Sequence, residues 1–195
     1  SAPGVASAPA VDRPVAVAEA LRTLLALQAR VRPEQIADDE TIDGLFEGVS
    51  SRRNQVLLDL GAEFDLGTLD AAHEKPIGAL AVEMARRAGR YAHPGPYLRA
   101  AQDEALKRTL GRAGIGRKEA AAHLEAAFGM GPGWVGATLD ALAIEAREGA
   151  SARGGALGGF EAGAALDRSA AQVLLDRAVE SAGRRAGCTF ARQDV

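Results

Sequence analysis

The residues best placed to do chemistry lie at the start of an amphipathic segment, residues 48–65. A serine, Ser50, follows shortly after a glycine, and apolar side chains come after it at the spacing of one helix face: Leu57, Leu60 and Phe64. A hydroxyl at a helix N-terminus is well placed to carry or hold a phosphate, because free N–H groups and the helix dipole favour an anion there. The alternative is that Ser50 only caps the helix, which is the common use of serine at that position.

The segments around this serine give it a context. A long amphipathic helix is expected over residues 15–31, followed by an irregular stretch and then by the serine-headed helix, which ends in Ala-Glu-Phe-Asp. This order resembles an acyl carrier protein, in which the serine that carries 4′-phosphopantetheine begins the second helix. Leu60 and Phe64 follow at offsets that match that family when Ser50, and not Ser51, is the attachment residue.

A closer resemblance is to the enlarged carrier domain of fungal-type type I fatty acid synthases and their actinobacterial relatives. Residues 48–55, Gly-Val-Ser-Ser-Arg-Arg-Asn-Gln, correspond to that family's Gly-Lys-Ser-Thr-x-x-Asn-Glu, and the actinobacterial form is the most similar. The resemblance covers roughly residues 15–190. It includes the Pro-Gly-Pro run at 94–96 and the glycine-rich turn at 128–134.

The resemblance implies a non-catalytic carrier domain that holds growing acyl chains as thioesters on a 4′-phosphopantetheine arm attached to Ser50. The implied partners are a phosphopantetheinyl transferase and the ketoacyl synthase, ketoacyl reductase, dehydratase, enoyl reductase and acyl or malonyl transferase domains of the same synthase. Val49, which stands where the family often has lysine, is an expected docking residue together with Arg52 and Arg53.

Other interpretations stay open beside this one. The two arginines could equally be ordinary exposed helix residues. The chain could be a purely structural helical domain of a multienzyme, or a carrier domain of a related polyketide synthase. The mass of the protein purified from its native host separates a carrier from a structural domain.

The composition indicates a soluble helical protein. The chain has 195 residues, of which 47% are hydrophobic, 25% charged and 4% aromatic, and its net charge is −3. Abundant alanine favours closely packed helices. The charge balance does not suggest nucleic-acid binding, and no apolar run approaches the ~20 residues of a membrane span. The single cysteine, Cys188, excludes an intramolecular disulfide and fits a reducing cytoplasm.

The expected architecture is all-α: a four-helix bundle of the acyl carrier type, extended by a second subdomain of about four helices. Residues 1–14, rich in alanine and proline, indicate a tethering linker. Residues 15–93 are assigned to the carrier subdomain, 94–190 to a structural helical subdomain and 191–195 to a tail. Further helices are expected at 51–64, from 76 onward, and at about 97–110, 118–128, 133–147 and 168–185.

Other patterns that could mark a site are better explained by structure. Residues 111–118 are glycine-rich, but no predicted strand leads into them, so a helix end and a turn are expected in place of a nucleotide site. The acidic run over 38–43 lacks calcium-loop spacing and is expected to face water. Trp134 is expected to pack between helices. The histidines lie too far apart in the sequence to suggest a metal site: His73, His93 and His123.

Overall fold

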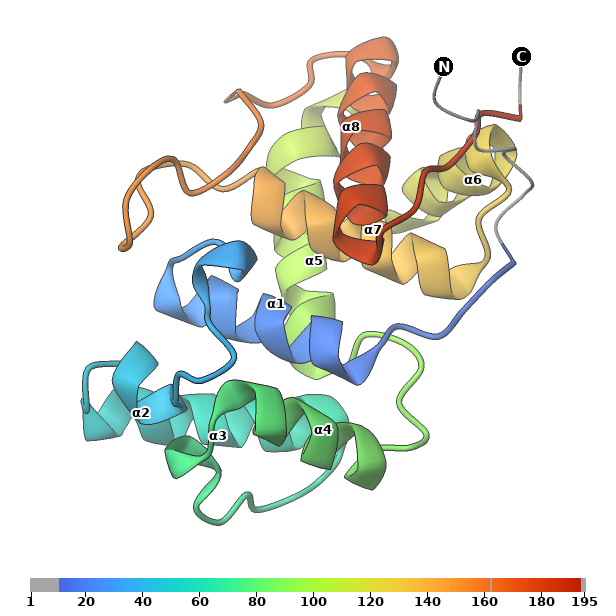
Figure 1. Ribbon diagram of the computed structural model, residues 1–195. Coiled ribbons are helices and arrows are strands. Elements are labelled where there is room, and N and C mark those ends of the chain that lie inside the picture. Colours follow the sequence, from blue (N-terminus) through green and yellow to red (C-terminus); the bar gives the residue numbers. More distant parts are fainter. Residues whose placement is uncertain (1–10, 162, 194–195) are drawn as a thin grey trace, which may run out of the picture. The chain divides into compact units, whose positions relative to one another are not determined.

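The computed structural model describes residues 11–161 and 163–193, and within these residues the regular elements are helices, with no sheet. The all-α prediction is therefore confirmed, and the predicted helix bounds agree with the observed ones to within about two residues. The α-helices are α1 (Val17–Ala29), α2 (Ile42–Leu45), α3 (Ser50–Phe64), α4 (Ile77–Arg87), α5 (Pro96–Leu110), α6 (Arg117–Phe128), α7 (Pro132–Glu145) and α8 (Arg168–Ala186) (Figure 1). The 3-10 turns are η1 (Pro33–Gln35), η2 (Ala72–Glu74) and η3 (Gly111–Ala113).

The described chain forms two compact units. The first, here called the Ser50 unit, contains residues 15–101 and 144–161. The second, here called the Trp134 unit, contains residues 11–14, 102–143 and 163–193. Residues 144–161, which the sequence assigned to the structural half, thus group with the Ser50 unit. The expected linker, 1–14, and the expected tail, 191–195, lie partly outside the described residues.

Helix α1 forms the centre of the Ser50 unit. Most of its apolar side chains are buried, and Leu21, Leu24 and Leu25 are fully buried. Helices α3 and α4 both pack against it (Figure 1). Burying one such side chain stabilises the fold by about 2 kcal/mol. The apolar residues between α1 and α3 fold inward, and all four are buried: Ile36, Ile42, Leu45 and Phe46.

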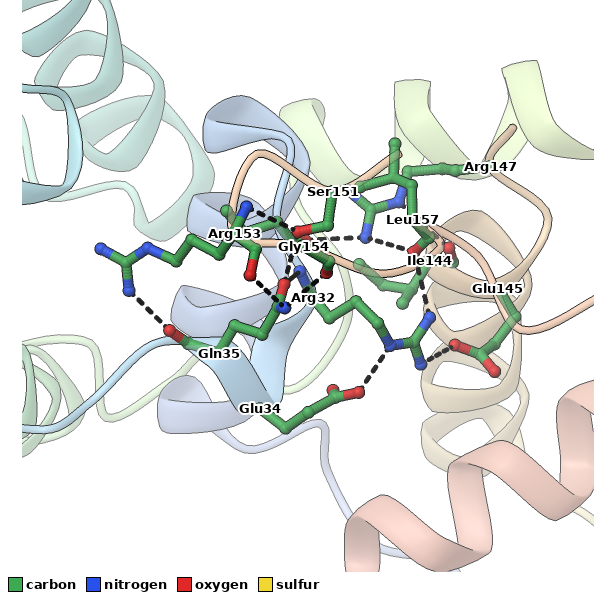
Figure 2. Close-up of polar contacts among 11 residues, drawn as sticks. Arg32, Glu34, Gln35, Ile144, Glu145, Arg147, Ser151, Arg153, Gly154 and Leu157 are labelled. Atoms are coloured by element: carbon green, nitrogen blue, oxygen red, sulfur yellow. Dashed lines mark hydrogen bonds and ion pairs between the residues drawn. The ribbon is translucent and has the colours of Figure 1, made fainter. Parts of the chain in front are cut away.

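Residues 144–161 are fastened within the Ser50 unit by Arg147 (Figure 2). Its guanidinium donates hydrogen bonds to the carbonyl oxygens of Ala26, at 3.1 Å, and Val31, at 2.8 Å. The positive group therefore sits at the C-terminal end of α1, where the helix dipole favours it. Burial lowers the pKa of Arg147 to about 10, so the side chain is still charged at neutral pH.

Two further arginines tie this segment to the chain that follows α1. Arg32 pairs with the buried carboxylate of Glu145. Arg153 donates to the carbonyl oxygen of Gln35 at 2.6 Å and to Oε2 of Glu40 at 2.7 Å. Hydrogen bonding from Arg153 lowers the pKa of Glu40 below its usual value. Glu40 was expected to face water as part of an acidic run, so this part of the prediction is wrong: an ion pair holds it.

The Trp134 unit is organised around Trp134, which is buried at the start of α7. The indole Nε1–H donates to the carbonyl oxygen of Val11 at 3.0 Å, and the ring of Phe190 meets the indole edge-on at 4.8 Å between centroids. Arg13 places its guanidinium 4.2 Å from the indole centroid. The Asp12 carboxylate accepts hydrogen bonds from backbone N–H groups of the first turn of α7. Residues 11–13 are thus packed against this unit.

Candidate functional site

A tight turn between α2 and α3 sets the position of Ser50. Two consecutive residues adopt left-handed backbone conformations, Glu47 at φ 56° and Gly48 at φ 71°. The Gly48 N–H donates to the carbonyl oxygen of Asp43 at 2.8 Å, and the Val49 N–H donates to that of Phe46 at 3.1 Å. Glycine is suited to the second position because it adopts positive φ without steric cost. The turn ends α2 and starts α3 within a few residues.

Ser50 is the first residue of α3, and its side chain is exposed. Val49 occupies the N-cap position, since its carbonyl oxygen accepts the first helical bond, from the Arg53 N–H at 3.0 Å. Within the described residues, the Ser50 hydroxyl has no hydrogen-bond partner. The alternative interpretation of Ser50 as the N-cap residue is therefore wrong. The Ser50 hydroxyl is thus exposed and takes part neither in capping the helix nor in packing the core.

The expected docking residues surround Ser50, but the structure gives the two arginines additional contacts. Arg53 is half-buried and forms an ion pair with Asp43 of α2 at 3.1 Å. Arg52 places its guanidinium 5.0 Å from the centroid of the Phe46 ring. Val49 is 42% exposed. Both arginines therefore brace the turn before Ser50. The sequence did not indicate this, because the contacts cross a turn and have no helical spacing.

A groove of about 740 Å³ runs along α3 beyond Ser50. It begins at Asn54, one helical turn after Ser50 and on the same face. Its α3 side continues through apolar and small residues, and its other side is the chain between α3 and α4. The lining residues include Leu57, Leu58, Gly61, Ala62, Leu69 and His73.

Gly61 lets the chain beyond α3 come close to the helix at this groove. A Cβ atom at Gly61 would lie 2.2 Å from the backbone oxygen of Gly67, so a side chain cannot fit there without moving the chain. Leu69 is buried, and Leu66 packs against the core. The shape of the groove thus depends on one small residue in α3.

Glu63, in the Ala-Glu-Phe-Asp ending of α3, is buried and structural. Its carboxylate accepts hydrogen bonds from the Tyr91 hydroxyl at 2.6 Å, from the Leu98 N–H at 2.8 Å and from the Gly95 N–H. The Tyr91 ring also packs on Phe64, with 4.6 Å between centroids. The acidic residue of the motif therefore joins the end of α3 to the start of α5, and it is not displayed to a partner.

The remaining candidate patterns do not come together as a site. Residues 111–118 form η3 and a turn into α6. His123 hydrogen-bonds to Asp176 at 2.9 Å, and His73 lies 3.6 Å from Glu74. Over residues 11–161 and 163–193, no three His, Cys, Asp or Glu side chains form a group that could hold a metal ion. The same residues contain no helix with the length and apolar character needed to cross a membrane.

Comparison with known proteins does not assign this chain to a family. The chain matches no protein-family model and no curated protein sequence. Its functional interpretation therefore depends on the geometry around Ser50 and on the resemblance of the segment that contains it.

Proposed function

We propose that this chain is an acyl carrier domain of a type I fatty acid synthase. It is not a catalyst: it carries growing acyl chains as thioesters on a 4′-phosphopantetheine arm attached to Ser50. The observation that supports this most directly is the Ser50 hydroxyl, which is exposed at the first residue of α3 and has no side-chain partner among the described residues. A serine used only for structure would be expected to cap the helix.

The surroundings of Ser50 suit a phosphodiester. The first turn of α3 contains no acidic residue, and the N–H groups of residues 50–52 have no partner within the helix. Arg52 lies two residues after Ser50 and brings positive charge to the same turn, whereas the charge of Arg53 is paired with Asp43. The negative charge of the phosphate is therefore favoured at this end of the helix. When bound, the group supplies a thiol that holds the acyl chain as an activated thioester.

In the attachment reaction, the only reacting group that this chain supplies is the Ser50 hydroxyl. Oγ of Ser50 forms a bond to the phosphorus that bears the pantetheine group of coenzyme A, and the bond from that phosphorus to the oxygen bridging to the nucleotide part breaks. Adenosine 3′,5′-bisphosphate leaves, and a base of the transferase accepts the hydroxyl proton. The exposed position of Ser50 lets another protein's active site reach the hydroxyl.

The groove along α3 is a second support for a carrier role. Its walls are mainly apolar and it starts one helical turn after Ser50. An apolar groove of this kind suits an alkyl chain, because contact with Leu57 and Leu58 removes apolar surface from water. In the proposed role, the domain presents its cargo to the ketoacyl synthase, the two reductases, the dehydratase and the transferase domains of a cytoplasmic synthase.

The experiment that tests this proposal is loading of the apo protein. Incubation with coenzyme A, Mg²⁺ and a cognate phosphopantetheinyl transferase should add one phosphopantetheine group, detected by intact mass and mapped to Ser50 by peptide analysis. Ser50→Ala should abolish loading and leave the melting temperature nearly unchanged, whereas the matched control Ser51→Ala should still be loaded. Modification at Ser51, or no modification with a transferase shown to be active on another carrier, would point to the structural alternative.

A further inference from the structure

One amide side chain near the start of α3 differs from its neighbours. Arg53, which precedes it, pairs with Asp43. Gln55, which follows it, donates a hydrogen bond to Asp59 at 3.2 Å. Asn54, between them, is exposed and has no hydrogen-bond partner among the described residues. Its two N–H donors and its acceptor oxygen are therefore available to another group.

The helix itself gives no reason for an asparagine at this position. Asn54 is the only asparagine in the chain, and asparagine is a poor helix former because its short amide competes for backbone hydrogen bonds. Asn54 lies a full turn beyond the N-cap of α3, so it does not cap the helix, and its exposed side chain adds nothing to the core. A residue that lowers helix stability and forms no hydrogen bond within the described chain indicates a role outside folding.

The position of Asn54 relates it to Ser50 and to the groove. Asn54 follows Ser50 by four residues, and side chains at this spacing are neighbours on a helix, with about 5–6 Å between their Cβ atoms. Because each Cα–Cβ bond of a helix tilts toward the N-terminus, the Asn54 side chain leans toward Ser50. Asn54 is also the residue at which the groove begins. Its amide thus lies between the proposed attachment residue and the groove.

We propose that Asn54 is a positioning residue for the 4′-phosphopantetheine arm: its amide donates hydrogen bonds to the phosphodiester on Ser50 and holds the start of the arm beside the groove. This inference rests on the proposed function. The unesterified oxygens of a phosphodiester only accept hydrogen bonds, which matches the two donors of the amide. Hydrogen bonds to a charged acceptor are stronger than those between neutral groups. Arg53 follows Ser50 by three residues, but its guanidinium is already directed to Asp43.

The test follows the Asn54 amide by NMR in the full chain before and after loading from coenzyme A. Because the chain has a single asparagine, isotopically labelled asparagine gives side-chain signals from Asn54 alone. Exchange of these N–H groups with water should slow by about tenfold on loading, the size expected for one hydrogen bond to a charged acceptor. In the loaded protein, Asn54→Ala should shift the phosphorus NMR signal of the arm. The matched control, Gln55→Ala, removes the neighbouring amide on another side of the helix and should leave that signal in place.

Each other outcome counts against the inference in a recognisable way. If Ser50 is loaded and exchange of the Asn54 amide stays as fast as before, Asn54 does not hold the phosphodiester, and the proposed function stands. Equal shifts of the phosphorus signal in Asn54→Ala and Gln55→Ala would likewise overturn a specific contact. If the transferase does not load Asn54→Ala, the exchange measurement on the original chain decides. Absence of any loading on Ser50 overturns both proposals.

Discussion

Glu63 has a structural role that its three hydrogen bonds define. Its carboxylate accepts three hydrogen bonds in a buried position, and two of them come from backbone N–H groups at the start of α5. Hydrogen bonds to a charged group contribute more than neutral ones. In the sequence, however, this glutamate belongs to the Ala-Glu-Phe-Asp segment, and nothing there distinguishes it from an exposed acidic residue.

Glu63→Gln should destabilise the fold by about 2 kcal/mol. With its oxygen at the position that accepts from Tyr91 and Gly95, the amide places its NH₂ group against the Leu98 N–H and leaves a buried donor without a partner. Tyr91→Phe removes only one of the three hydrogen bonds and should cost about 1 kcal/mol. Urea denaturation followed by circular dichroism measures both. Equal effects of the two changes would mean that the backbone contacts contribute little.

Gly61→Ala should also destabilise the protein, by about 1–3 kcal/mol, because the new methyl group collides with the Gly67 backbone oxygen. The chain must move away from α3, and the groove must change with it. Leu58→Ala on the exposed side of the same helix is the control and should change the free energy of unfolding by less than about 0.5 kcal/mol. Thermal melts of the two variants provide the comparison.

For single residues, the sequence predicted the position of Ser50 at the start of α3, but it did not predict the contacts of the neighbouring arginines. The position of Ser50 at the head of α3 followed from the apolar spacing of the helix. The pairing of Arg53 with Asp43 did not, because it depends on how a turn with two left-handed residues folds back. Such contacts leave no periodic signal in the chain.

The longer helices were predictable because each carries an apolar face that repeats over several turns. Helix α2 and the turn η1 were missed, since three or four residues are too few to show a period. The place of residues 144–161 in the Ser50 unit was missed for a different reason. It depends on arginines that bind backbone carbonyls, such as Arg147, and a carbonyl acceptor is present at every position of a sequence.

The ion pair between Glu40 and Arg153 should make the anchoring of residues 144–161 sensitive to acid. The pKa of Glu40 is lower in the folded protein than its ordinary value of 4.5, chiefly because Arg153 hydrogen-bonds to it. The stabilisation is therefore fully present above pH 4.5 and is lost as the pH falls through the folded pKa. Urea titrations at decreasing pH should show Glu40→Gln less stable by about 1 kcal/mol or less at neutral pH. The difference should vanish in acid, and a difference that persists there would exclude the ion pair as its cause.

Asp12 should stabilise α7 although it lies in the segment expected to be a linker. Its carboxylate accepts from the first N–H groups of that helix, as a capping residue does. Asp12→Ala should cost about 1 kcal/mol, and Asp12→Asn, which keeps an acceptor oxygen, should cost less. Trp134 is the only tryptophan in the chain, so its fluorescence reports unfolding of this unit. Equal stability of the alanine variant and the original protein would show that the cap contributes nothing.

For the whole molecule, the division into units predicts what truncation after Tyr91 would do. Leu98 and Ile144 lie beyond that point and are almost fully buried in the core of the Ser50 unit. Each contributes about 2 kcal/mol by burial. Truncation should therefore lower the melting temperature clearly, while Ser50 remains available for loading. A truncated protein that melts with the full chain would show that residues 15–91 are stable alone.

The two units should unfold together in the complete chain. Helix α5 contributes residues to both, with 96–101 in the Ser50 unit and 102–110 in the Trp134 unit, and α7 is divided in the same way. Melting either unit removes part of a continuous helix from the other. Trp134 fluorescence and far-ultraviolet circular dichroism should consequently show coincident transitions. Two separate transitions would identify independently folding domains.

The contacts of Val11 and Asp12 with the start of α7 also affect the length of chain by which a tethered domain could move. The contacts that hold these residues include the capping by Asp12, the indole hydrogen bond to Val11 and the stacking of Arg13 on Trp134. Their release would add residues 11–14 to whatever chain precedes them, a gain of roughly 13 Å when extended. If the domain is tethered as we propose, its reach would depend on whether these contacts are intact, as well as on the number of residues in the linker.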